Sequence, residues 1–237
     1  MRFCAIIPCY NHGETLGDVI EGLPDSLPAI VVDDGSDTSI STNAHSIIRL
    51  EKNSGKAAAL VAGFKKATEL GFTHALTLDA DNQHDPRFAE KFMTLSLEHP
   101  NALIAGVRDF DNPAIPPKRR FMNRFSNFWF RFETSTDLKD TQCGYRLYPM
   151  KLINGLNLSC TRYAFEAEIL VKCVWSGGEI IPLEIPTIYT TASTQNSHYR
   201  AFWDTLLISL MNTKLSFMKV FFTDAMRKRI SQKKDNA

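Results

Sequence analysis

The sequence has few cysteines, no long apolar run and almost no net charge, and each absence excludes a class of protein. Its five cysteines are scattered along 237 residues and never form a C-x-x-C pair. This argues against a disulfide framework or a zinc site and favours a reducing compartment. The formal net charge of +1 gives no overall reason to expect nucleic-acid binding.

No segment is predicted to cross a membrane or to serve as a signal peptide. The apolar segment Phe3–Pro8 is shorter than the core of a signal peptide and runs directly into polar residues. The apolar stretch Trp203–Phe222 is interrupted by Asn212, Lys214 and Lys219, whereas a spanning helix needs about 20 apolar residues in succession. We therefore expect a cytoplasmic protein whose contact with a bilayer, if any, is peripheral.

Apolar runs alternate with helical patterns along the chain, and this alternation predicts an α/β fold with a mostly parallel sheet covered by helices on both faces. The expected strands are Phe3–Ile7, Ala29–Val32, Ser46–Leu50, His74–Leu78, Ala102–Val107 and Glu179–Ile185. The expected helices are Thr15–Leu23, Lys56–Leu70, Arg87–His99, Phe165–Trp175 and Ala201–Met226. We expect one domain over residues 1–200, followed by a C-terminal amphipathic helix and basic tail over residues 201–237.

Two acidic residues follow the fourth expected strand. Asp79 and Asp81 are two positions apart, and side chains at i and i+2 of an extended chain point the same way. Adjacent buried carboxylates repel unless a cation or a proton neutralises them. A hard divalent cation, Mg²⁺ or Mn²⁺, shared with substrate phosphates would do so. An Asp-x-Asp sequence alone also fits a solvated turn.

Polar residues follow three other expected strands. These segments are Pro8–Asn11, Asp33–Ser36 and Asn53–Lys56. Ordinary turn chemistry explains any one of them. However, ligands of open α/β sheets bind outside the carboxyl ends of the strands. Four polar clusters at one edge, two of them doubly acidic, therefore predict a ligand site there.

A set of short motifs occurs in a fixed order over roughly residues 3–190. The motifs are Ile6–Asn11 with Glu14, Val31–Ser36, Asn53–Lys56, Asp79–His84, Gly106–Arg108, Asp140–Arg146 and Phe165–Glu168. Each is of modest specificity, but the ordered set closely resembles the family 2 glycosyltransferases, within them the dolichyl-phosphate mannose synthase-like branch. The resemblance implies the glycosyltransferase-A fold, which is Rossmann-like, and inverting, metal-dependent transfer from a nucleotide-diphospho-sugar donor.

The resemblance also implies roles for individual residues. For the donor nucleotide, the matching residues are Pro8, Tyr10, Glu14, Asp33 at the base, and Asp34 and Lys56 in support. For the metal they are Asp79, Asp81 and Gln83, with Asp79 also on the donor-phosphate side. Negative charge accumulates on a leaving diphosphate and needs cations nearby. The arginine candidates are Arg108, Arg124 and Arg146, the last two in motifs that bind phosphate in this branch.

The acceptor is less closely specified by the sequence. A polyprenyl phosphate is already an anionic nucleophile, whereas a hydroxyl acceptor needs a base, for which Asp140 is the candidate by motif. A cap of a helix or turn explains Asp140 equally. The Gln-x-x-Arg-Trp motif of processive polysaccharide synthases is absent. The loop Thr194–Arg200 departs from the Arg-Gly and Ser-Lys pattern of the branch; His198 or Arg200 either contacts donor phosphate or lies on a plain surface loop.

Two segments combine basic and apolar residues as interfacial helices do. One is Lys118–Phe132, and the other is the C-terminal helix with the tail that follows it. The apolar stripe of that helix is Trp203, Leu206, Leu207, Leu210, Phe217, Met218 and Phe221, and the tail cations are Arg227, Lys228, Arg229, Lys233 and Lys234. We expect peripheral contact with the inner face of the plasma membrane. A helix packed on the protein core is the alternative, and RNA binding has no further support.

We therefore expect an inverting glycosyltransferase with a lipid-linked or membrane-associated acceptor. Two alternatives stay open, a catalytically silent nucleotide-sugar-binding protein and a transferase acting on a soluble hydroxyl acceptor. A nucleotidyltransferase would need a Gly-rich N-terminal loop with Arg and Lys, and a dehydrogenase would need Gly-x-Gly-x-x-Gly after the first strand. Neither pattern is present.

Overall fold

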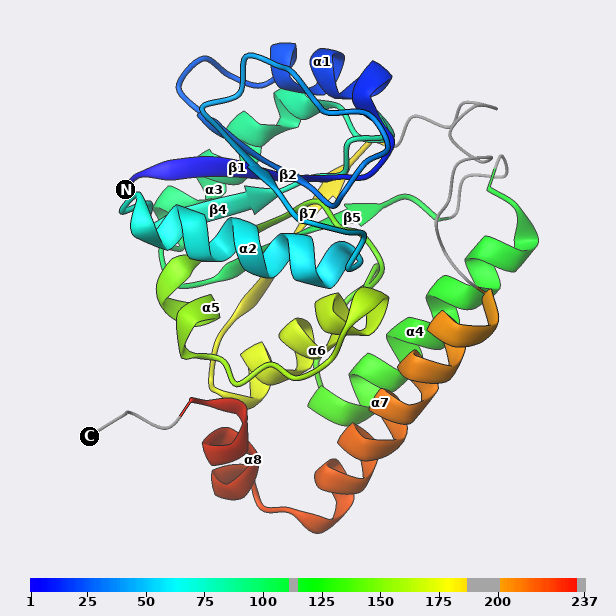
Figure 1. Cartoon of the computed structure of the whole chain (residues 1–237). Helices are drawn as coiled ribbons and strands as arrows, with labels where there is room; N and C mark the ends of the chain where they lie inside the picture. Colours follow the sequence, from blue (N-terminus) through cyan, green and yellow to red (C-terminus); the bar gives the residue numbers. More distant parts are fainter. Residues whose placement is uncertain (111–114, 187–200, 234–237) are drawn as a thin grey trace.

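A computed structural model describes residues 1–110, 115–186 and 201–233, except for the side chains of residues 201–204. A seven-stranded sheet lies between helices on both of its faces (Figure 1). The strands are β1 (Phe3–Cys9), β2 (Ala29–Asp33), β3 (Ser46–Arg49), β4 (His74–Thr77), β5 (Leu103–Arg108), β6 (Arg146–Pro149) and β7 (Ile180–Ile185). Their order in the sheet is β3-β2-β1-β4-β6-β5-β7. The α/β fold predicted from the sequence is confirmed.

The sheet is mostly parallel, with one antiparallel strand that was not expected. β1 pairs in parallel with β2 and β4, β2 with β3, and β5 with β7, whereas β6 is antiparallel to both of its neighbours. Because β6 runs in the opposite direction, its amino end lies at the edge where β4 ends. Thr77 pairs with Arg146, and the Thr77 hydroxyl donates to the carbonyl of Gly144 at 2.7 Å. The segment Asp140–Arg146 therefore reaches the carboxyl edge of the sheet.

The helices that follow the strands begin and end at residues with local signals. They are α1 (Gly13–Glu21), α2 (Lys56–Glu69), the 3₁₀ turn η1 (Pro86–Phe88), α3 (Ala89–Glu98), α4 (Pro117–Thr134), α5 (Met150–Gly155), α6 (Arg162–Trp175), α7 (Ala201–Phe221) and α8 (Asp224–Ser231). Gly55 and Gly71 flank α2 with φ values of 89° and 74°, which suit glycine. Pro86 begins η1, where the Asp85 carboxylate accepts from the backbone N–H of Arg87.

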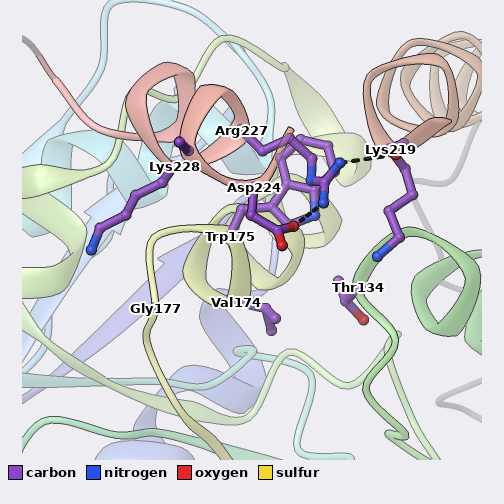
Figure 2. A pocket seen from close by; sticks show the side chains of 9 residues that line it. Thr134, Val174, Trp175, Gly177, Lys219, Asp224, Arg227 and Lys228 are labelled. Atoms are coloured by element: carbon purple, nitrogen blue, oxygen red, sulfur yellow. Dashed lines mark hydrogen bonds and ion pairs between the residues drawn. The ribbon is translucent and has the colours of Figure 1, made fainter. Parts of the chain in front are cut away.

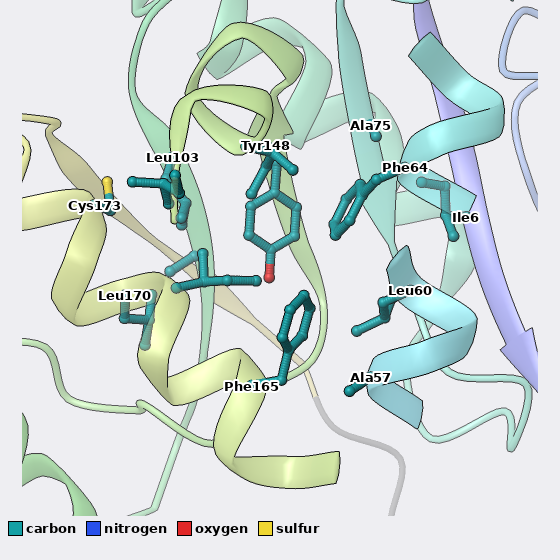
Figure 3. Packing of buried hydrophobic residues seen from close by; sticks show 14 of the residues in the cluster. Ile6, Ala57, Leu60, Phe64, Ala75, Leu103, Tyr148, Phe165, Leu170 and Cys173 are labelled. Atoms are coloured by element: carbon teal, nitrogen blue, oxygen red, sulfur yellow. The ribbon is translucent and has the colours of Figure 1, made fainter. Parts of the chain in front are cut away.

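Alternate residues of the central strands supply two separate cores. In β1, Cys4 and Ile6 face α2 and α6, whereas Ala5 and Ile7 face α1 and α3. Figure 3 shows the first core, where Tyr148 of β6 lies between α2 and α6. Its ring meets that of Phe64 edge-on, with centroids 5.4 Å apart. Burial on both faces explains why these strands read as continuous apolar runs.

The structure of the C-terminal region differs from the prediction of a single helix over Ala201–Met226. The chain instead forms α7 and α8, because the Thr223 hydroxyl caps α8 by accepting from the backbone N–H of Met226 at 3.3 Å. Leu156 forms a bridge with Gln232, so α8 lies against the body of the domain. Of the expected tail cations, Arg227 is therefore buried, whereas Lys228 and Arg229 are exposed on α8.

Some expectations lie outside the described residues. They concern His198 and Arg200 of the loop Thr194–Arg200, the side chain of Trp203, and Lys234. Within the described part of the chain, no helix has the length and apolar character needed to cross a bilayer.

Candidate active site

The ends of β1, β2 and β4 converge at one edge of the sheet, as expected. In the register of β1 and β2, Cys9 lies opposite Asp33. The backbone N–H of Asn11 donates to the Ser36 hydroxyl at 2.9 Å, which ties the two following loops together. Asn11 and Asn82, in two loops at this edge, have φ values of 57° and 58°. Non-glycine residues in the left-handed region carry strain and concentrate at functional sites.

Three charged side chains from distant segments meet at this edge, and we call Lys56, Asp79 and Glu166 the charge cluster. The Lys56 amine lies 2.7 Å from Asp79 Oδ1 and 3.2 Å from Glu166 Oε2. Gly144 borders the cluster so closely that a Cβ atom there would lie 2.8 Å from Lys56 Nζ. The other oxygen of Glu166, Oε1, is buried without a hydrogen-bond partner. The amine thus links the first carboxylate of Asp-x-Asp to α6.

The two Asp-x-Asp carboxylates have opposite electrostatic surroundings. Burial favours the neutral acid at Asp79, but the charge of Lys56 outweighs it and lowers the pKa of Asp79 below its ordinary value. The carboxylates of Asp79 and Glu166 raise the pKa of Lys56 despite its burial. Burial, together with the charge of Asp79, raises the pKa of Asp81 to about 6. Asp81 therefore holds a negative charge at neutral pH that no protein cation within ion-pair distance neutralises among the described residues.

A divalent metal fits this donor set. Asp79 and Asp81 offer carboxylate oxygens, and Gln83 follows in the same turn, where its backbone N–H donates to Asp81 Oδ1 at 3.1 Å. Carboxylate and amide oxygens suit Mg²⁺ or Mn²⁺. The described residues contain no group of three or more histidine, cysteine or acidic side chains placed to hold a metal by themselves. Any metal here would need further ligands from a bound substrate or water.

The acidic pair after β2 holds the surrounding loops in place. Asp33 accepts from the backbone N–H of Ser36 at 2.8 Å and pairs with Arg49 at 2.6 Å. Asp34 accepts from the backbone N–H groups of Ser54 and Gly55 at 2.8 and 2.7 Å. Asp34 therefore positions the turn that leads into Lys56, which agrees with the supporting role expected for it.

The remaining nucleotide candidates lie along the first loop. Pro8 and Tyr10 are half-buried and Glu14, in the first turn of α1, is exposed. The Thr15 hydroxyl donates to the carbonyl oxygen of Ala80, so α1 is tied to the Asp-x-Asp turn. The loop after β1 therefore lies beside the charge cluster, as the sequence predicts.

Asp140 is fully buried and both of its carboxylate oxygens are occupied. Arg108 donates to it from Nε at 2.6 Å and from Nη2 at 3.1 Å, and Asn123 Nδ2 donates at 2.9 Å. The backbone N–H groups of Gln142 and Cys143 also donate to Oδ1. In this arrangement Asp140 anchors Arg108 and the turn before β6. This is the turn-capping role expected from the sequence as the alternative to a catalytic base.

Of the other two arginine candidates, one lies beneath the charge cluster and the other on the surface. Arg146 is 1% exposed, and its amino groups donate to the carbonyl oxygens of Glu166 at 2.8 Å and Thr141 at 2.9 Å. It therefore supports the turn before β6 and the start of α6 from beneath. Arg124 is exposed on α4. Arg108, by contrast, lies close enough to Asp79 for its charge to act, after that of Lys56, on this carboxylate.

Sequence reasoning missed two participants at this edge. Glu166 lies within the motif Phe165–Glu168, but the sequence offered no reason to assign it a role in the site. Its contact with Lys56 follows only from the packing of α6 against the sheet. Arg49 was not considered, although it ends β3 beside Asp33. Arg49 could have been found from the sequence, because it lies near the end of the expected strand Ser46–Leu50, close to the end of the neighbouring strand, where Asp33 lies.

Comparisons with known proteins agree with this geometry. A family model described as glycosyl transferase family 2 matches residues 4–155. The chain is 25% identical over 209 residues to polyprenol monophosphomannose synthase of Mycolicibacterium smegmatis, covering 80% of this chain and 77% of the relative. It is 26% identical over 205 residues to undecaprenyl-phosphate mannosyltransferase of Micrococcus luteus, covering 78% and 83%. It is 27% identical over 223 residues to UDP-N-acetylglucosamine–dolichyl-phosphate N-acetylglucosaminyltransferase of Methanococcus voltae, covering 79% and 86%.

A solved structure supports the fold. Glucosyl-3-phosphoglycerate synthase from Mycobacterium tuberculosis, in complex with Mn²⁺, uridine diphosphate and phosphoglyceric acid, matches with a TM-score of 0.66 and 14% sequence identity. The match covers 94% of this chain and 80% of that one. It confirms a fold of the glycosyltransferase-A type.

Proposed function

The chain belongs to glycosyl transferase family 2, in its dolichyl-phosphate mannose synthase-like branch, and we propose that it transfers a sugar from a nucleotide-diphospho-sugar to a lipid-linked phosphate. The observation that carries this proposal is the charge cluster beside Asp81, at the edge where the ends of β1, β2 and β4 converge. A cationic amine and an unneutralised carboxylate there suit a diphosphate bound together with a divalent cation.

The donor would lie across the ends of β1 and β2. The loops Pro8–Asn11 and Asp33–Ser36 are tied together by the Asn11 to Ser36 hydrogen bond and form one wall for the nucleoside. Buried Asp33 would position the exposed Arg49 guanidinium beside it for the edge of a base. Asp34 and Lys56 place the start of α2 toward the diphosphate, where the helix dipole also favours negative charge.

The metal ligands would be Asp79, Asp81 and Gln83. A divalent cation at this position neutralises the diphosphate and stabilises it as a leaving group. Lys56 holds Asp79 in its ionised form and so keeps that carboxylate ready for the cation. Attack of the acceptor on the face of the sugar opposite the diphosphate would invert the configuration of the anomeric carbon.

The state of Asp140 favours a phosphate acceptor over a hydroxyl. A hydroxyl must lose a proton to a base as it attacks, whereas a phosphate oxygen is already negative. Both oxygens of Asp140 accept hydrogen bonds from Arg108 and other donors, so the carboxylate has no free position for a proton. The relatives are named for polyprenol, undecaprenyl phosphate and dolichyl phosphate, and these names agree with a phosphate acceptor.

The pair of helices α4 and α7 would hold the protein on a membrane surface. The helices lie side by side along one flank of the domain (Figure 1). Their exposed large apolar residues are Phe121, Phe125, Phe128 and Phe132 on α4, and Leu206, Leu210, Phe217, Val220 and Phe221 on α7. Exposed Lys118, Arg124 and Lys214 accompany them. Apolar and basic residues together suit an anionic leaflet, and this supports peripheral binding at the inner face of the plasma membrane.

Donor binding is tested by thermal unfolding with uridine or guanosine diphosphate, each with and without Mn²⁺. A ligand at about 100 times its Kd stabilises the native state by about 2.7 kcal/mol. Asp81→Asn should abolish the manganese-dependent part of that shift, whereas Asp25→Asn, an exposed residue before β2, should not. Stabilisation by neither nucleotide in the parent protein would refute the proposal. Sugar transfer to a polyprenyl phosphate in vesicles then separates an enzyme from a silent binding protein.

A further inference from the structure

A hollow lies at the opposite end of α6 from the charge cluster. It has a volume of about 310 Å³ and lies between the carboxyl ends of α4, α6 and α7 and the start of α8. Figure 2 shows Trp175 and Val174 of α6 on one side and Lys219 and Thr134 on another. We call it the α8 cavity. It shares no residue with the site at the edge of the sheet.

Lys219 is an unusual residue for this position. It follows Leu215 by one turn of α7, so it lies on the inward face of the helix, and Leu215 is 2% exposed. Its amine donates to the Ser135 hydroxyl at 3.0 Å. No carboxylate in the described part of the chain lies within ion-pair distance of that amine. A half-buried cation turned toward a cavity without a counter-charge is costly unless an anion joins it.

The two acidic groups nearby do not supply that counter-charge. Asp224 pairs with Arg227, whose guanidinium also donates to the carbonyl oxygens of Lys219 and Phe222 at the end of α7. Glu133 accepts from the Ser216 hydroxyl at 3.3 Å. Burial raises the pKa of Glu133 to about 8, so this carboxyl is mostly neutral at pH 7.

Lys228 adds a second cation on another side of the same cavity. It lies on α8, is exposed, and makes no ion pair within the described residues. In Figure 2 its side chain and that of Lys219 lie on opposite sides of the hollow. Since Arg227 and Asp224 neutralise each other, the two lysines leave the cavity with a net positive charge.

We propose that the α8 cavity binds a phosphate ester, with Lys219 as the direct contact and Lys228 as a charge at its rim. This site goes beyond the proposed transfer reaction and does not depend on it. A lipid headgroup and a soluble phosphate ester share the required chemistry. The surroundings favour the lipid, because Val220 and Phe221, next to Lys219 in α7, are both more than 60% exposed. Only this choice of source depends on the membrane contact proposed above.

The test uses the full chain with glycerol 3-phosphate and with vesicles of phosphatidylcholine with or without phosphatidylglycerol. Binding is followed through the indole N–H resonance of Trp175, assigned with Trp175→Phe, and through co-sedimentation. Lys219→Gln should weaken binding at least tenfold and Lys228→Gln about threefold. The matched control is Lys65→Gln, which removes the same charge from an exposed position of α2, a helix outside the proposed membrane face.

Each result decides for or against the site. Loss of binding to anionic vesicles in Lys219→Gln but not in Lys65→Gln supports a lipid headgroup. The same pattern with glycerol 3-phosphate alone supports a soluble ester. Equal effects of the two substitutions, or no response of Trp175 to any probe, would overturn the proposal. The stabilisation of each variant by nucleoside diphosphate and Mn²⁺ is measured in parallel, so failure of this site is distinguishable from failure of the donor site.

Discussion

Replacing Gly144 by alanine should perturb the charge cluster without adding or removing a charge. The φ angle of Gly144 is not in the left-handed region, so alanine fits its backbone conformation. The new Cβ atom would lie 2.8 Å from Lys56 Nζ, 3.1 Å from Asp79 Oδ2 and 3.2 Å from Glu166 Oε1. Ordinary contacts begin near 3.4 Å, so the amine must move by about 0.6 Å.

This shift has a calculable electrostatic cost. At an effective dielectric constant of about 20, lengthening the Lys56–Asp79 pair from 2.7 Å to about 3.3 Å lowers its attraction from about 6 to about 5 kcal/mol. The weaker pair with Glu166 loses a similar amount if the amine also moves away from it. We expect Gly144→Ala to lower the free energy of unfolding by about 1–2 kcal/mol and to weaken nucleoside diphosphate binding by about 5- to 30-fold.

Urea unfolding and titration with uridine or guanosine diphosphate and Mn²⁺ measure the two effects. The matched control is Gly17→Ala in α1, where nothing lies within 4 Å of the added Cβ. That change should stabilise the protein by about 0.5–1 kcal/mol, because alanine favours a helix, and leave binding unchanged. A Gly144→Ala protein with the stability and affinity of the parent would refute the close packing of the three charges.

Three further substitutions test separate parts of the structure. Asp140→Ala removes the buried carboxylate that pairs with the half-buried Arg108 and should lower the free energy of unfolding by about 3 kcal/mol in urea; a pure catalytic base would lose turnover alone. The folded state keeps a proton on Glu133 up to about pH 8 that the unfolded state releases near its ordinary pKa of 4.5. Stability should therefore fall as pH rises from about 5 to 8, and Glu133→Gln should remove a slope of up to about 1.4 kcal/mol per pH unit. Phe128→Asp on α4 should reduce sedimentation with anionic vesicles, whereas Leu97→Asp, equally exposed on α3, should not; equal losses would contradict the assigned face.

The order of most strands and helices was readable from the sequence because its signals are local, although α4, β6 and α5 were not among the predicted elements. A strand buried on both faces must be apolar, as residues 29–32 of β2 are, and a helix needs an end signal such as Gly71. The carboxyl ends of parallel strands meet at one edge wherever such a sheet forms. The convergence of Asp33 and Asp79 at one edge therefore followed from the pattern alone.

Contacts between distant segments were decided only by the tertiary structure. β6 has four residues and no distinctive period, so its antiparallel insertion between β4 and β5 was not predicted. The pairing of Lys56 with Glu166 depends on how α6 lies against the sheet. The occupied state of Asp140 likewise depends on donors from β5 and α4.

The C-terminal helices show the same division. Apolar spacing in the sequence predicted a helix with one apolar stripe, and α7 confirms the helix. The break at Thr223, the burial of Arg227 and the inward direction of Lys219 depend on the packing of α8 and α7 against α4 and α6. A sequence determines which residues recur on one face of a helix, whereas the neighbours that meet each face determine which cations are neutralised and which are left to bind an anion.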